Sequence, residues 1–323
     1  MPDTIKIGNV EANAGEKRFG SLKIGETPLR NIELPIGIIN GAQDGPTVCI
    51  IAGEHPYEYA GIDGAIRVYR KLKPEEVNGA LIVVPVVNVP GLEARSMYVN
   101  PLDNINLAFV YPGSPDDSIS YRIAYTMLND IVSKANYLLN LHGGDLPEIM
   151  APFVIVGTYE DPKVDAVSEQ MGRAFGLEYI VIGEEVRPTI NCEAGKRGIP
   201  SIVSEVGSLG LFEEDDIRTQ EVGVLNVLKY LKALEGEPIP CKTKQKIVRR
   251  GYMIRANRGG LFYPNVKAAV EVEKGEVLAE IRDLKGDLLE EVIASEAGWV
   301  TYMFMRHVVN TGDPLYSLGR LEK

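Results

Sequence analysis

Two of the three histidines in the sequence stand where a metal site could form. His55 follows the apolar run 47–53, and His142 closes the apolar run 137–141, and both runs are typical of buried strands. Glu58 lies three residues after His55, a spacing that a tight turn can close. Two histidines, one glutamate and an open fourth position form the ligand set of a catalytic zinc site. A histidine after a strand is also often a hydrogen-bonded structural residue, so spacing alone leaves both interpretations open.

A glutamate lies inside a third apolar run. Glu205 belongs to the segment 201–207, SIVSEVG. A carboxylate is costly to bury there unless it has a partner or a chemical task. Beside zinc it can take a proton from water that the metal has made more acidic, and otherwise it could pair with a buried arginine. The third histidine, His307, lies in a strand-rich segment far along the chain, and we assign it no metal role.

The order of apolar patterns predicts an α/β fold. Strand-like runs at 47–53, 80–88, 137–142, 153–157, 179–183 and 201–207 alternate with helical spacing at 60–72, 119–134, 163–175 and 214–234. Such alternation predicts a mixed, mainly parallel sheet flanked by helices on both faces. Sites of these sheets form at the carboxyl ends of the strands, where both histidines fall. Residues 1–46 are predicted to form short strands and turns.

The last quarter of the chain has a different pattern. A basic stretch at 242–246 is interpreted as a linker, and residues 247–323 are strand-rich and contain a repeat. We predict a catalytic domain at 1–240, with its β segment at 1–46, and a C-terminal β-rich domain at 247–323 that resembles the lipoyl-type barrel sandwich and is structural or interface-forming. The repeat aligns Val272, Gly275, Leu278 and Ile281 with Val309, Gly312, Leu315 and Leu318.

Composition excludes several classes of partner. The net charge of −11 opposes binding to nucleic acid or to an anionic membrane. The three cysteines are widely spaced and fit a reducing compartment, so we expect a cytoplasmic protein. No apolar run reaches the roughly 20 residues that span a bilayer. A small-molecule substrate is the expected partner, and homo-oligomer formation stays open.

In order and spacing, these motifs resemble the succinylglutamate desuccinylase/aspartoacylase family of zinc carboxypeptidase-like proteins, over nearly the whole chain. The resemblance implies one zinc ion per chain on His55, Glu58 and His142, with Glu205 as the general base and acid. It also implies hydrolysis of an amide that releases an acyl group from a small amino-acid-like molecule. The motifs are Gly53-x-His55-x-x-Glu58 with Gly61, Asn140 to Asp145 (NLHGGD), Ser204 to Gly207 (SEVG), and the loop with Pro101, Asp103, Asn106, Leu107, Pro112 and Gly113.

The chain departs from the family at the residues that recognise the substrate. Ala108 and Phe109 stand where the family has an Asn-Arg pair that grips a carboxylate, and Met97 stands where it has an arginine. Neither Phe nor Ala can make the bidentate contacts of arginine, so we expect altered recognition and take Arg95 as a substitute cation. Three functions remain: a zinc deacylase, a metallocarboxypeptidase, and a non-catalytic zinc-binding protein derived from the family.

Overall fold

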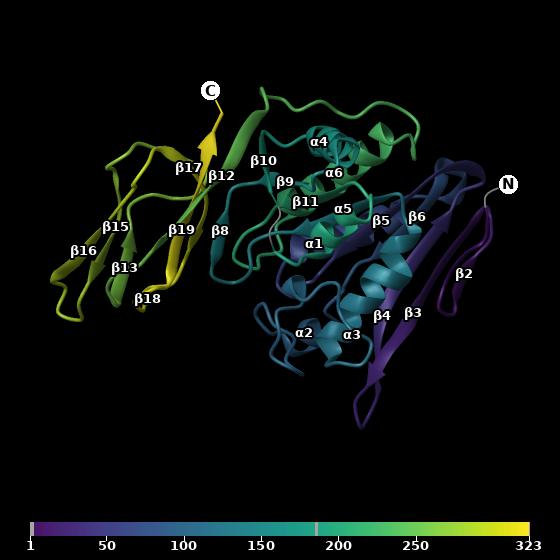
Figure 1. Ribbon diagram of the computed structural model, residues 1–323, viewed down its shortest axis with the longest axis horizontal. Helices are drawn as coiled ribbons and strands as arrows, with labels where there is room; N and C mark the ends of the chain where they lie inside the picture. The colour runs from purple at the N-terminus through teal and green to yellow at the C-terminus, as the bar shows by residue number, and fades with distance from the viewer. Residues whose placement is uncertain (1–2, 185–186, 323) are drawn as a thin grey trace.

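A large mixed sheet forms the centre of the molecule (Figure 1). The structure is a computed structural model that describes residues 3–184 and 187–322. Within these residues the sheet has 13 strands, in the order β14-β17-β19-β12-β10-β9-β11-β7-β5-β6-β4-β3, with β8 paired to β17. Its strands are β3 (Glu16–Glu26), β4 (Asn31–Asn40), β5 (Gln43–Ala52), β6 (Asn78–Val84), β7 (Tyr137–His142), β8 (Glu148–Met150), β9 (Phe153–Thr158), β10 (Tyr179–Glu184), β11 (Ser201–Glu205), β12 (Lys246–Arg255), β14 (Glu271–Val272), β17 (Gly298–Phe304) and β19 (Pro314–Leu321).

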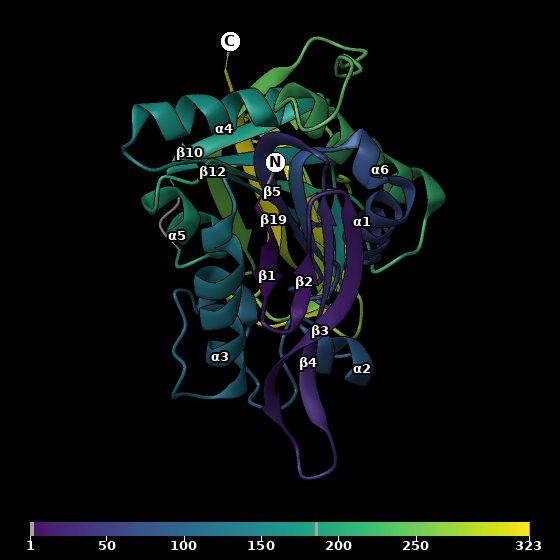
Figure 2. The same cartoon turned by 90° about the vertical axis from the view of Figure 1, so that its right-hand side faces the viewer.

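Helices cover both faces of this sheet (Figure 2). The alternation of side chains along β5 shows why: Val48 and Ile50 join one buried cluster, whereas Cys49 and Ile51 join the other. Helices α1, α4 and α6 pack on the first face, and α3 and α5 on the second. The predicted α/β architecture is confirmed, with helices α1 (Tyr59–Lys71), α2 (Val89–Ala94), α3 (Ile119–Thr126), α4 (Pro162–Phe175), α5 (Ile190–Lys196) and α6 (Glu214–Tyr230).

Two local predictions differ from the structure. The helix predicted over 119–134 changes its hydrogen bonding after Thr126, through a π-helical turn (Met127–Ile131) and a 3-10 turn (Val132–Lys134). Within this segment Asn129 donates to the Tyr125 carbonyl, and Ser133 donates to the Asn129 carbonyl, so side chains compete with the helical pattern. Residues 1–46 contain two short strands, β1 (Ile5–Ile7) and β2 (Val10–Ala12), but β3 and β4 form a long hairpin rather than short strands.

The strand-rich C-terminal segment forms a sandwich that continues the main sheet. A second sheet, in the order β16-β15-β13-β18, shares one core with β12, β14, β17 and β19. Each half of the predicted repeat has a strand, a glycine turn and another strand. Strand β12 pairs with β10, and Trp299 stacks on Tyr179, so the main sheet continues from the predicted catalytic domain into the predicted C-terminal domain. The division into two domains stays a prediction. The second sheet consists of β13 (Gly260–Pro264), β15 (Val277–Arg282), β16 (Leu288–Ile293) and β18 (Val308–Val309).

No helix in the described part of the chain has both the length and the apolar character needed to cross a membrane.

Candidate active site

Three parallel strands deliver the predicted site residues to one edge of the sheet. Strands β5, β7 and β11 are neighbours, and all run in the same direction. His55 lies just beyond the end of β5, His142 is the last residue of β7, and Glu205 is the last residue of β11. In the register of the sheet Glu205 lies directly beside His142. The three candidate residues therefore lie at the carboxyl ends of neighbouring parallel strands, where sites of such sheets usually form.

Two glycines allow the turn between β5 and α1. Gly53 has a φ of +67°, so the chain can leave the strand in a conformation that other residues adopt with strain. Glu58 then occupies the N-cap position of α1, and its side chain makes no capping hydrogen bond, so the carboxylate is left for the histidines. Gly61 lies against β7 so closely that a Cβ atom there would be 2.7 Å from the Leu141 carbonyl oxygen. This close approach of α1 to β7 brings Glu58 beside His142.

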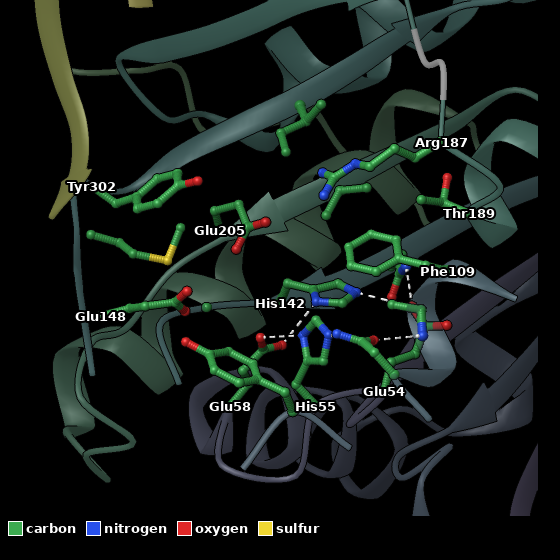
Figure 3. A pocket seen from close by; sticks show the side chains of 18 of the residues that line it. Glu54, His55, Glu58, Phe109, His142, Glu148, Arg187, Thr189, Glu205 and Tyr302 are labelled. Carbon is green, nitrogen blue, oxygen red and sulfur yellow. Dashed lines mark hydrogen bonds and ion pairs between the residues drawn. The ribbon is translucent and has the colours of Figure 1, made fainter. Parts of the chain in front are cut away.

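His55, Glu58 and His142 form a compact group that could hold a metal ion, with ligand atoms within 4.8 Å of one another. Nδ1 of His55 lies 2.7 Å from Oε1 of Glu58, and Nδ1 of His142 lies 2.9 Å from Oε2 (Figure 3). The Nε2 atoms point elsewhere, to Asn106 at 3.2 Å and to Glu54 at 3.0 Å. Both imidazoles therefore turn the same nitrogen toward the carboxylate.

The charges of this group fit a divalent cation. Burial alone raises the pKa of Glu58, but the two imidazoles outweigh burial and hold it at about 2. Burial alone lowers the pKa of His142, but the charge of Glu58 and the bond to Glu54 raise it well above its usual value. Both oxygens of Glu58 are thus in contact with an imidazole nitrogen, Oε1 with His55 and Oε2 with His142. A buried carboxylate between two imidazole nitrogens suits zinc, which prefers nitrogen and oxygen ligands in this mixture.

Glu54 contacts the Nε2 atom of His142, on the side of the ring away from Glu58, and sequence reasoning missed this role. Its side chain is buried and accepts hydrogen bonds from Tyr111 at 2.7 Å, Asn140 at 2.9 Å and His142 at 3.0 Å. A carboxylate bonded to the second nitrogen of a ligand histidine fixes the orientation of the ring and makes it a stronger ligand. Its position next to His55 was visible in the sequence, but its partners lie 57 to 88 residues away.

Glu205 and the candidate metal group face one cavity of about 450 Å³. Glu205 makes no hydrogen bond or ion pair within the described residues, and burial raises its pKa to about 8, against the opposing effect of His142. In Figure 3 its carboxylate projects into the cavity above His142. A carboxylate there can accept a proton from water at the metal group and return it to a leaving group.

The structure does not bring Arg95 to this cavity. Arg95 ends α2 in a left-handed conformation with an exposed side chain, and neither it nor Met97 lines the cavity. Ala108 and Phe109 do line it. The guanidinium of Arg187 lies 4.4 Å from the centre of the Phe109 ring and supplies a positive charge at that wall. Arg187 carries no local sequence signal, because it lies 78 positions from its aromatic partner.

The C-terminal segment also contributes to the wall of the cavity. Tyr302, Phe304, Arg306 and Pro314 all line it. Strand β8 positions this wall, because Glu148 pairs with Phe304 in the register between β8 and β17. The C-terminal segment was expected to be structural or interface-forming. Because it lines the cavity, it could also contact a bound molecule.

The chain belongs to the succinylglutamate desuccinylase/aspartoacylase family. The family's catalytic domain, described as "Succinylglutamate desuccinylase/Aspartoacylase catalytic domain", matches residues 44–231, and the resemblance seen in the motifs is confirmed. A deacylase-type amide hydrolase is the class that this membership supports.

Individual relatives are similar along almost their whole length. N-alpha-acetyl-L-2,4-diaminobutyric acid deacetylase of Halomonas elongata is 25% identical over 320 residues, which cover 95% of this chain and 92% of the relative. A succinylglutamate desuccinylase/aspartoacylase from Rhodobacter sphaeroides has a TM-score of 0.88 at 25% identity, covering 95% and 96% of the two chains. The product-bound ectoine utilization protein EutE (DoeB) from Ruegeria pomeroyi shares the fold, with a TM-score of 0.88 at 24% identity, covering 94% and 95%.

Proposed function

We propose that this chain is a zinc-dependent deacylase that hydrolyses the amide bond of a small acylated amino acid. His55, Glu58 and His142 hold the zinc ion, and Glu205 is the catalytic base and acid. The observation that carries the proposal is the convergence of both Nδ1 atoms on Glu58, at 2.7 and 2.9 Å, beside a cavity into which Glu205 projects, without an ion-pair partner among the described residues. The similar Halomonas elongata protein is named for the removal of an acetyl group from an amino acid, which supports this substrate class.

The zinc ion and the side chains have different tasks in the proposed reaction. Zinc would supply the Lewis-acid chemistry that activates water and polarises the substrate carbonyl. Glu205 accepts one proton from the water as its oxygen adds to the carbonyl carbon. The carbon–nitrogen bond then breaks, and Glu205 passes that proton to the leaving nitrogen. The products are an amine and a carboxylic acid, which keeps the second proton of the water and releases it to solvent on ionising, and Glu205 returns to its starting state.

Arg187 gives the substrate an anchor. Its guanidinium stacks on Phe109 at the cavity wall, in the region where the family's Asn-Arg pair would stand. A planar guanidinium binds a carboxylate bidentately, which suits the free carboxylate of an acylated amino acid. Ala108 and Phe109 led us to expect altered substrate recognition. In this proposal the carboxylate-binding site is not lost but moves from positions 108 and 109 to Arg187.

Two variants test the assignment of roles. His142→Ala should bring the bound zinc, measured by metal analysis, well below one ion per chain. Glu205→Gln should retain zinc but lower kcat by about 10²- to 10⁴-fold, because the amide keeps the shape of the side chain and cannot act as a base. The control is Glu235→Gln, which changes an exposed glutamate. Loss of zinc from the Glu205 variant would make this residue a ligand, and unchanged zinc in the His142 variant would refute the metal site.

A panel of substrates separates the remaining functions. The zinc-loaded protein should hydrolyse acylated amino acids faster than dipeptides with a free C-terminal carboxylate. Faster cleavage of the dipeptides would identify a metallocarboxypeptidase. Zinc binding without turnover of either class would identify a non-catalytic member of the family. The presence of Glu205 in the cavity argues against the last result, because a purely structural ion needs no base beside it.

A further inference from the structure

The cavity has walls of opposite charge on either side of the proposed catalytic centre. Glu148 and Arg187 both line it, and in Figure 3 they lie on opposite sides of Glu205 and His142. Tyr302 lies within electrostatic range of all three charged groups: Glu148 and Glu205 raise the pKa of its hydroxyl, after burial, and Arg187 lowers it. A molecule with one anionic and one cationic group could therefore bridge the cavity across the catalytic centre.

The carboxylate of Glu148 has no cationic partner in the described part of the chain. It accepts a hydrogen bond of 3.1 Å from the backbone N–H of Asp145, and the neutral Tyr98 hydroxyl nearby also favours its charged form. Burial raises the pKa of Glu148 to about 7, and the nearby charge of Glu58 contributes to the increase. A carboxylate taken out of water without a cation is unfavourable, and a buried charge is normally paired or has a function. The other three glutamates that line the cavity, Glu54, Glu58 and Glu205, already have roles in the proposed site, and nothing in the proposed reaction requires Glu148.

Arg306 is the cation that could neutralise Glu148 from within the chain. It follows β17, lines the cavity, and lowers the pKa of the Tyr98 hydroxyl, while burial and the charge of Glu148 raise it. Arg306 therefore lies on the same side of the cavity as Glu148, but the two side chains form no ion pair. The test below includes their pairing as an outcome.

We propose that Glu148 binds a free ammonium group of the substrate, so that the preferred substrates are acylated diamino acids that retain one cationic amine. This inference rests on the proposed deacylase function. The carboxylate of the substrate binds Arg187, the acylated nitrogen lies at Glu205, and the second amine lies against Glu148. The ammonium group supplies the charge that the buried carboxylate lacks, and the backbone N–H of Asp145 holds the carboxylate in place.

The test compares substrates that differ only in the charge of the side-chain end. Nα-acetyl-L-2,4-diaminobutyrate has an ammonium group where Nα-acetyl-L-norvaline has a methyl group of similar size. The zinc-loaded full-length enzyme should prefer the diaminobutyrate derivative in kcat/KM by about tenfold or more, as expected for a buried charged hydrogen bond. Glu148→Gln should remove most of this preference by raising KM for the cationic substrate, with little change for the norvaline derivative. Glu235→Gln, an exposed change of the same type, should leave the preference intact.

Binding of the deacylated products tests Glu148 separately from catalysis. Calorimetry should show that L-2,4-diaminobutyrate binds the wild-type protein more tightly than L-norvaline and that Glu148→Gln abolishes the difference. If the wild type hydrolyses neither substrate but retains this binding preference, the deacylase proposal fails and the role of Glu148 stands. If both substrates are hydrolysed equally, or the preference survives in Glu148→Gln, the inference is overturned, because Arg306 or a proton then neutralises Glu148.

Discussion

Replacement of Glu54 by Gln tests whether the buried carboxylate behind His142 determines metal affinity. In the structure one oxygen of Glu54 accepts the Tyr111 hydroxyl, and the other accepts from both Asn140 and His142. A glutamine can keep its carbonyl oxygen toward Asn140 and His142. Its amide NH₂ then faces Tyr111, whose hydroxyl can rotate and accept a hydrogen bond. The variant should therefore fold with every hydrogen bond retained and only the charge removed.

The magnitude follows from that loss of charge. A hydrogen bond to a charged group contributes about 1.5–3 kcal/mol, and a neutral one about 0.5–1.5 kcal/mol. The bond between residue 54 and His142 should thus weaken by roughly 1–1.5 kcal/mol, which corresponds to a factor of about ten in an equilibrium constant. Changes behind a ligand histidine typically weaken metal binding by about 10- to 100-fold. We expect Glu54→Gln to bind zinc at least about tenfold more weakly.

Competition with a chromophoric chelator measures this affinity directly. Circular dichroism and thermal unfolding of the metal-free variant establish that the fold is intact, and Glu235→Gln is the matched control. A folded Glu54→Gln variant with zinc affinity within about twofold of the wild type would refute the reasoning, because a twofold change is only about 0.4 kcal/mol. Either His142 would not be a ligand, or Glu54 would not be charged in the native protein.

Two further predictions concern the substrate wall and the C-terminal segment. Arg187→Ala should raise KM for acylated amino acids by about tenfold or more. It should have a smaller effect on KM for acylated amines that lack a carboxylate. If Arg95→Ala raises KM equally or more in the same assay, Arg95 is the residue that binds the carboxylate. Truncation after Glu235 should preserve zinc binding, because all three proposed ligands precede residue 143, but should reduce solubility by exposing the edge of β10. A soluble, monodisperse truncation that has lost zinc would contradict the predicted two-domain division.

The sequence by itself was sufficient to locate the strands and to single out the candidate residues His55, Glu58, His142 and Glu205. The apolar runs before His55, His142 and Glu205 are local patterns, and a strand buried on both faces needs such a run. The i to i+3 spacing of His55 and Glu58 is also local, and a single turn closes it to 2.7 Å. The topology rule for parallel sheets then places the ends of the strands before His55 and His142 on one edge without knowledge of side-chain contacts.

The tertiary structure alone decided which side chains surround that edge. Glu54 became the support of His142 only when packing brought Tyr111 and Asn140 to it. Arg187 reached Phe109 from a distant loop, whereas Arg95, close in sequence to the expected position, turned to solvent. The charge of Glu148 gained its place in the cavity because β8 pairs with β17. No sequence period encodes these contacts, because they join separate elements and depend on the direction in which each side chain leaves the backbone.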